Sequence, residues 1–72
     1  MMKKTVSYYY ELDSEISKKI ISDIVLQGEV ATSTAYMWMQ GKRKPLPLYQ
    51  KLIQRIIKKY YNVNVPRKEL FS

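Results

Sequence analysis

The sequence contains no cysteine and no histidine. It therefore has no disulfide, thiolate nucleophile or imidazole base, and it lacks the ligands of almost every zinc site. Its six acidic residues do not form the pattern of a calcium loop, which needs acids at short spacings around a glycine. Serine, lysine and tyrosine remain, but no spacing brings a nucleophile to a base. We expect no enzyme, no cofactor, no small-molecule substrate and no metal site.

Glycine and long apolar runs are also scarce. The only glycines are Gly28 and Gly41, which excludes a glycine-rich phosphate loop. No apolar run approaches the about 18 residues that are needed to span a bilayer. The first residues lead into Thr5 and Val6 and not into the apolar core of a signal peptide. We expect a soluble cytoplasmic protein, associated with the nucleoid, that has no membrane partner.

Positive charge is concentrated in one half of the chain. Thirteen lysines and arginines stand against six acids, which gives a net charge of +7. Residues 1–30 carry a net charge of −1, and residues 31–72 carry +8. A concentrated positive field favours a polyanion such as DNA, RNA or an anionic membrane surface. The alternative is that the excess charge only keeps a small protein in solution.

A chain of 72 residues is predicted to form one domain, residues 1–72, that buries roughly 60% of its unfolded-chain surface. We expect a mainly α fold: a small domain of three to four helices with a short N-terminal β-strand. The expected parts are an extended arm or strand over 1–12, a helical core over 14–61 and a C-terminal tail over 62–72.

The N-terminal segment alternates in the way that is typical of a strand, with Val6, Tyr8 and Tyr10 on one face. A single strand leaves its backbone hydrogen bonds unmade, so it needs a partner, either residues 62–65 or the same strand of a second copy. We predict the strand, and with it a possible homodimer through Val6, Tyr8 and Tyr10. The alternative is a helix whose first turn is capped by Ser7.

The next segment has the pattern of an amphipathic helix. Asp13 is the expected N-cap, and Glu15 lies in the first turn, where the helix dipole favours a negative charge. The helix is predicted to run from Ser14 to about Gln27, with Gly28 as its C-terminal stop. Five aliphatic residues share one stripe of this helix: Ile16, Ile20, Ile21, Ile24 and Val25.

Two further helices are expected in the core. A short one ends at Gln40, with Thr32 or Ser33 as its N-cap and Gly41 as a left-handed exit. A longer one follows over 47–61, after a basic connector that contains two prolines. One more turn in the tail is expected to dock two apolar residues on the core: Leu70 and Phe71.

The segment from Ala31 to Pro45 contains Trp38, then Gly41, then the run Lys42-Arg43-Lys44-Pro45. It closely resembles the recognition helix and following loop of helix-turn-helix proteins of the phage Cro and repressor type. That family ends this element with a tryptophan, a glycine two or three residues later and a Lys/Arg-Pro run. The resemblance is close over 22–45 and looser from there to the Glu69-Leu70-Phe71 ending.

Four features depart from the family pattern, one of which is a tail between Tyr61 and Leu70 that is about two residues longer than in the family. Val25 stands where the family commonly has alanine in the bracing helix, and Glu29 stands where it favours glycine in the turn. The family also has a separate helix before the bracing helix, whereas the N-terminal segment here has the pattern of a strand. These departures indicate a divergent member in which a tyrosine-rich strand replaces the first helix.

The resemblance implies a role for each matching position. Ala35 and Trp38 match buried positions that hold the recognition helix on the domain. The candidates for contact with DNA bases are Thr32, Ser33, Tyr36, Met37 and Gln40. The candidates for contact with DNA phosphates are Lys42, Arg43, Lys44, Lys51 and Arg55. Gln40 is the only one of the base-contact set with a side chain suited to bidentate base recognition, so we expect modest or shape-dependent sequence specificity.

The sequence therefore predicts a double-stranded DNA-binding protein that acts as a transcriptional regulator or as an accessory factor of a mobile element. A small protein-protein interaction module is one alternative, and it predicts indifference to charge loss at Lys42, Arg43 and Lys44. An RNA or single-strand binder is another, since tyrosine rings beside a basic surface stack on unpaired bases.

Overall fold

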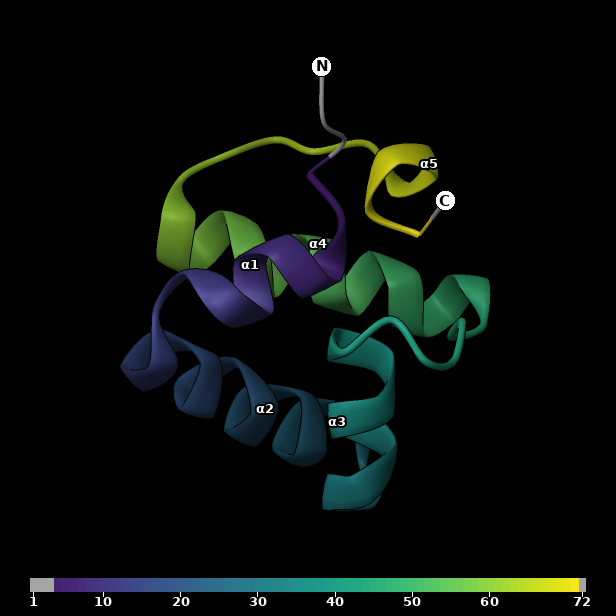
Figure 1. Cartoon of the computed structure of the whole chain (residues 1–72). Coiled ribbons are helices and arrows are strands. Elements are labelled where there is room, and N and C mark those ends of the chain that lie inside the picture. Colours follow the sequence, from purple (N-terminus) through teal and green to yellow (C-terminus); the bar gives the residue numbers. More distant parts are fainter. Residues whose placement is uncertain (1–3, 72) are drawn as a thin grey trace.

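The computed structural model of the chain describes residues 4–71, which form five α-helices joined by short connections (Figure 1). The helices are α1 (Val6–Leu12), α2 (Ser14–Gly28), α3 (Thr32–Met39), α4 (Pro47–Tyr61) and α5 (Arg67–Leu70). The mainly helical fold is confirmed. This part of the chain has one helix more than the three to four predicted, because the N-terminal segment forms α1 where a strand was expected.

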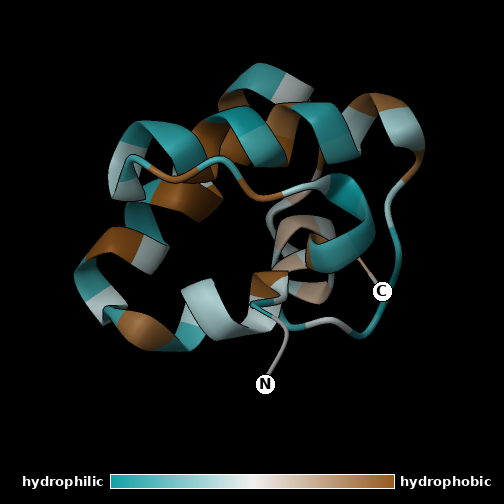
Figure 2. Ribbon diagram, turned by 90° about the horizontal axis from the view of Figure 1, so that it is seen from above, coloured by the Kyte–Doolittle hydropathy of each residue, from teal (hydrophilic) through white to brown (hydrophobic). Residues whose placement is uncertain are grey.

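The core lies between α2 and α4, and the other helices close around this pair. Hydrophobic and hydrophilic residues alternate within the turns of the long helices, as amphipathic helices require (Figure 2). The most deeply buried large side chains come from α2, α3, α4 and α5: Ile20, Ile24, Met39, Ile53, Ile56, Ile57 and Leu70. Each helix therefore contributes one face to a single small core.

The predicted N-terminal strand is wrong, and residues 4–71 contain no strand. In the helix α1, Val6 and Tyr9 lie three residues apart and both point into the core, where each is 3% exposed. The predicted strand face would have exposed Tyr9 to solvent. Burial of a large aromatic ring therefore outweighs the period-two pattern of the sequence. The helix starts after Thr5 and not at Ser7, so the alternative prediction was right about the helix and wrong about its cap.

Contacts from distant parts of the chain hold α1 in place. The Tyr9 ring packs on the Tyr61 ring at the end of α4, with 5.3 Å between their centroids. The Tyr61 hydroxyl donates a hydrogen bond to the Tyr9 carbonyl at 3.4 Å, and the Ser17 hydroxyl donates to the Tyr10 carbonyl. Burial raises the pKa of both Tyr9 and Tyr61. The tertiary structure therefore decides the conformation of this segment.

The N-terminal segment has no strand edge through which two copies could form the predicted homodimer, because it is helical. Val6 lies in the core of its own chain, and residues 62–65 form no strand. Tyr8 and Tyr10 are half-buried against the same core. A second copy therefore cannot pair with this segment as a β-strand, because its backbone is already hydrogen-bonded within a helix.

The start of α2 is as predicted, and its end is not. Asp13 caps the helix by accepting hydrogen bonds from the Glu15 and Ile16 amides at 2.9 and 3.1 Å. Gly28 is the last helical residue, and the left-handed residue that ends the helix is Glu29, with φ of 53°. Gly28 has a different role, since a Cβ at this position would lie 3.3 Å from Leu52 of α4. The glycine allows α2 and α4 to approach each other closely.

The prediction for α4 and the tail is confirmed. The helix begins at Pro47 and ends at Tyr61, and Leu70 and Phe71 are both buried. A hydrogen bond from the Tyr60 hydroxyl to the Asp23 carboxylate, at 2.7 Å, ties the end of α4 to α2. Lys59 lies 3.3 Å from the same carboxylate. The hydrogen bonds to Asp23 raise the pKa of both Tyr60 and Lys59.

Candidate nucleic-acid interface

The helices α2 and α3 pack together through a tight turn of residues 29–31 (Figure 1). Glu29 turns the chain with φ of 53° and ψ of 46°, in the left-handed region that favours glycine. A glycine would adopt this backbone conformation without steric strain. The turn keeps its geometry with a glutamate, at a cost in backbone strain of about 1–2 kcal/mol.

One face of α3 is buried, as predicted. Ala35 is 0% exposed and Trp38 is 6% exposed. The Trp38 ring packs against the Tyr49 ring of α4, with 4.9 Å between centroids. Met39 is also 0% exposed and adds a third anchor that the sequence analysis did not single out. The short helix is therefore held on both α2 and α4.

The other face of α3 carries all the predicted base-contact residues. Thr32, Ser33 and Gln40 are exposed, Tyr36 is 37% exposed, and Met37 is half-buried. Thr32 and Ser33 were predicted as alternative N-caps of this helix. That prediction is wrong, because the N-cap position is Ala31. As a result, the side chains of Thr32 and Ser33 lie in the first turn and make no cap hydrogen bond there.

The Tyr36 ring rests against α1. It meets the Tyr10 ring edge-on, with 6.2 Å between centroids and perpendicular planes. This contact restricts the Tyr36 side chain, so less conformational entropy is lost if the side chain is bound. The sequence analysis missed this role of Tyr10, because it placed Tyr10 on a strand.

The loop after α3 begins with a left-handed glycine, as predicted. Gly41 has φ of 77°, and its amide donates to the Trp38 carbonyl at 3.2 Å. The amides of Lys42 and Arg43 both donate to the Met37 carbonyl, at 3.0 and 3.3 Å. These hydrogen bonds satisfy carbonyl groups at the end of α3 and fix the direction in which the basic run leaves the helix.

A buried glutamine anchors the far end of the basic loop. The Gln50 side chain of α4 donates a hydrogen bond to the Pro45 carbonyl at 2.8 Å, and both residues are buried. Between these two anchored ends, Lys42, Arg43 and Lys44 are all exposed. The loop therefore presents three positive charges from a fixed backbone.

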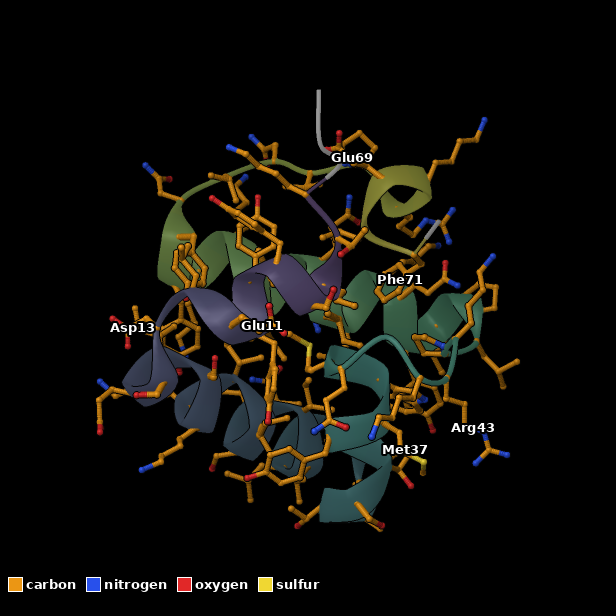
Figure 3. The ribbon with its side chains drawn as sticks, in the orientation of Figure 1. Glu11, Asp13, Met37, Arg43, Glu69 and Phe71 are labelled. Carbon is orange, nitrogen blue, oxygen red and sulfur yellow. The ribbon has the colours of Figure 1, made fainter. Side chains whose placement is uncertain are left out.

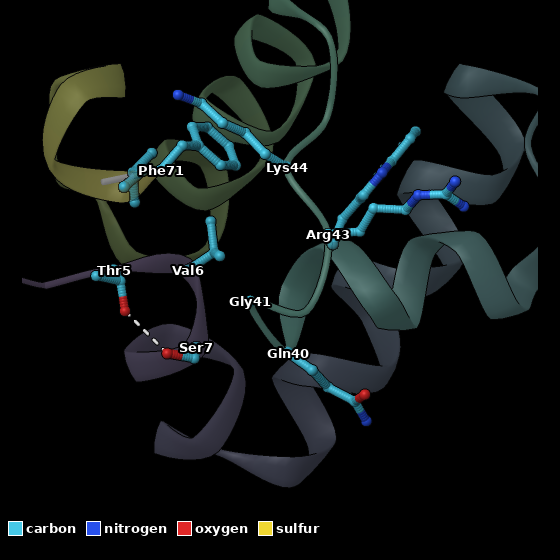
Figure 4. A pocket seen from close by; sticks show the side chains of 10 residues that line it. Thr5, Val6, Ser7, Gln40, Gly41, Arg43, Lys44 and Phe71 are labelled. Atoms are coloured by element: carbon cyan, nitrogen blue, oxygen red, sulfur yellow. Dashed lines mark hydrogen bonds between the residues drawn. The ribbon is translucent and has the colours of Figure 1, made fainter.

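The basic side chains of the loop diverge. In Figure 4, Lys44 points toward Phe71 and Arg43 points to the opposite side, around a pocket of about 420 Å³ that is lined by both. Figure 3 places Arg43 on the same side of the molecule as Met37 of α3. The backbone hydrogen bonds of Lys42 and Arg43 to the Met37 carbonyl hold both residues close to the end of α3.

The other predicted phosphate-contact residues lie in different surroundings. Lys51 and Arg55 are exposed one turn apart on α4, where they line a groove beside the α2–α3 turn. Lys44 lines a second pocket with Arg67 and Lys68 of the tail. The structure thus separates the basic residues into two groups on either side of the loop. The sequence analysis counted Arg67 and Lys68 in the charge of this half and did not select them, since a charge count carries no spatial information.

Within residues 4–71, no group of acidic side chains is arranged to hold a metal ion. None of the helices in the same range is long and apolar enough to cross a membrane. Comparisons with protein-family models, with curated proteins and with solved structures give no match to this chain.

Proposed function

We propose that the chain binds double-stranded DNA as a helix-turn-helix domain, with α3 in the major groove. The observation that carries the proposal is that a short helix, which packs on α1 and α2 and through Trp38 on Tyr49 of α4, exposes one polar face and leads directly into an anchored basic loop. A helix of this kind fits the major groove, and a braced helix presents its side chains in one orientation. A further support is that α1 precedes α2 in the chain, because the family that the sequence resembles usually has a helix before the bracing helix.

Two classes of contact follow from this arrangement. Thr32, Ser33, Tyr36, Met37 and Gln40 would face base edges or nearby phosphates, with the Tyr36 ring and Met37 suited to the methyl group of thymine. Lys42, Arg43 and Lys44 would contact phosphates, which fix the position of the helix on the duplex without reading sequence. Lys51 and Arg55 lie on the other side of the loop and are assigned to flanking phosphates.

A protein that binds DNA in this way needs no cofactor. We infer a role as a transcriptional regulator or as an accessory factor of a mobile element, because the exposed face of α3 and the basic loop beside it suit contact with DNA. With Gln40 as the only side chain of the set suited to bidentate base recognition, sequence preference would rest partly on DNA shape.

The test is duplex binding measured by fluorescence anisotropy across a salt series. The variant Lys42→Ala/Lys44→Ala is compared with Lys19→Ala/Lys58→Ala, which removes the same charge from exposed positions on α2 and α4. The loop variant is expected to lower the slope of log affinity against log salt by roughly 2, and the control variant by much less. Tyr36→Ala is expected to weaken binding by an amount that depends on the DNA sequence.

Three outcomes contradict the proposal. A folded chain that does not bind duplex DNA at low salt excludes it and favours a protein-interaction module. A preference for single strands over duplexes favours an RNA or single-strand binder. Equal salt slopes for the loop variant and its control would show that the basic loop makes no particular contact.

A further inference from the structure

The beginning of α4 and the end of α2 form an open groove with apolar walls and basic edges. The groove has a volume of about 450 Å³, and its lining includes Gly28, Leu48, Tyr49 and Leu52. Leu48 is 73% exposed, a large value for a leucine on a helix that otherwise buries its apolar residues. Gly28 has no side chain to fill the space in front of Leu52. We call this surface the α4 groove.

Charge and apolar surface lie side by side in the α4 groove. Leu48 and Leu52 are one helical turn apart, and Lys51 and Arg55 form a parallel row one turn apart. Glu29 is the acidic residue of the lining, so the positive charges predominate. An occupant that fits this groove needs an exposed apolar side chain with several negative charges around it.

The chain carries such a surface at its other end. Leu12, at the junction of α1 and α2, is 51% exposed. Three acidic residues surround it in the sequence, and all are exposed: Glu11, Asp13 and Glu15. Lys18 lies 4.0 Å from Glu15, and both side chains are more than 70% exposed, so this ion pair neutralises little of the charge. We call this surface the acidic corner.

The two surfaces lie at opposite ends of the molecule. The helix α2 begins directly after Asp13 and ends at Gly28, so its length of about 20 Å separates them. Figure 1 shows the α1–α2 junction on the left and the start of α4 on the right. Figure 3 shows Asp13 at the left edge, and Arg43 of the loop before α4 on the right. The acidic corner therefore cannot reach the α4 groove of its own chain.

We propose that the acidic corner of one copy docks in the α4 groove of a second copy, with Leu12 against Leu48 and Leu52. The contact joins two different surfaces, so it is head-to-tail, and each added copy leaves one groove and one corner free. The interface is small and each copy has a net charge of +7, so association is weak in free solution. Docking of two copies does not require DNA binding, and its test contains no DNA.

The test uses three exposed leucines of the same chain. Leu12→Ser removes the apolar side chain of the acidic corner, and Leu48→Ser removes that of the α4 groove. Leu26→Ser is the matched control, because Leu26 is 74% exposed on α2 and does not line the groove. All three positions are at the surface, so the variants are expected to fold, which circular dichroism checks.

Association is measured by sedimentation velocity from about 10 µM to about 1 mM, the range of weak contacts. The unchanged chain and Leu26→Ser are expected to form species that grow beyond a dimer as concentration rises. Leu12→Ser and Leu48→Ser are each expected to associate at least about ten-fold more weakly. An equimolar mixture of these two variants is expected to form a 1:1 dimer that does not grow, because it contains one intact pair of surfaces.

Several results would overturn the proposal. An unchanged chain that stays monomeric over the whole range excludes it. Leu12→Ser or Leu48→Ser variants that associate as the unchanged chain does show that these surfaces are not in contact. A mixture that stays monomeric, while the unchanged chain associates, shows that the intact corner of one variant does not dock in the intact groove of the other.

Discussion

The turn before α3 and the loop after it meet the same steric requirement in different ways. Each contains a residue in the left-handed region, Glu29 in the turn and Gly41 in the loop, with φ of 53° and 77°. The left-handed conformation costs a residue with a side chain about 1–2 kcal/mol and costs glycine almost nothing. The turn therefore stores backbone strain, whereas the loop does not.

The loop also has anchors of its own. Its first amides donate to carbonyl groups of α3, and the Gln50 side chain holds the Pro45 carbonyl. Lys42, Arg43 and Lys44 repel one another and favour an extended, mobile backbone. The comparison shows that the short turn is held by the packing of the helices on both sides, whereas the charged loop needs hydrogen bonds and an unstrained glycine.

The largest expected effect of breaking this arrangement comes from Gln50→Leu. The substitution leaves the buried Pro45 carbonyl without its hydrogen-bond donor, which lowers the free energy of unfolding by about 1–3 kcal/mol. Gln54→Leu is the matched control, because Gln54 donates at the same distance of 2.8 Å to the Val65 carbonyl at a less buried site. Urea denaturation measures both variants. Equal losses for the two would mean that the loop anchor has no special importance.

Gly41→Ala is expected to have the next largest effect. A Cβ at this position meets nothing closer than Ser7, at 3.9 Å, so the cost comes from the backbone conformation alone. We expect a loss of about 1–2 kcal/mol in the free energy of unfolding, measured by thermal or urea denaturation. Gly41→Asn should lose less, since asparagine tolerates the left-handed region better than alanine. Losses of the same size for alanine and asparagine would contradict this explanation.

Glu29→Gly is expected to have the smallest effect, with the opposite sign. Glycine relieves the strain in the turn but loses more conformational entropy on folding, which leaves a gain of about 0.5–1 kcal/mol. Glu29→Ala keeps the strain and removes the charge, so it should change stability little. The denaturation midpoints of the unchanged chain, Glu29→Gly and Glu29→Ala distinguish the effect of backbone strain from that of the lost charge. A stabilised Glu29→Ala variant would assign the gain to charge and not to the backbone.

The predictability of this fold differs between α4 and α1. The bounds of α4 could be predicted because its apolar stripe, Pro47 at its start and its basic outer face all indicate the same helix. The pattern of α1 fits both a strand and a helix over a short length, and the choice depends on Tyr61, which lies 52 residues from Tyr9. Patterns within a short window do not contain that contact.

Some features of the candidate site could likewise be predicted from the sequence, and others could not. The burial of Trp38 and the left-handed Gly41 could be predicted because each depends on its own chemistry and on its neighbours in sequence, whereas the burial of Ala35 was expected only from the resemblance. Two other features could not be predicted. Lys44 and Lys51 line different pockets, and the Tyr36 ring packs against the Tyr10 ring. These depend on how helices far apart in sequence are oriented in space.

The sequence by itself determined the positions of α2 and α4, the concentration of positive charge after residue 30 and the glycine exit from α3. These features follow from the periodicity, composition and steric properties of neighbouring residues. Only the tertiary structure decided that the N-terminal tyrosines form a helix, that Glu29 takes the left-handed position beside Gly28, and that basic residues lie on two sides of the loop. Packing around a small shared core imposes these outcomes, because burial of large side chains outweighs local preference.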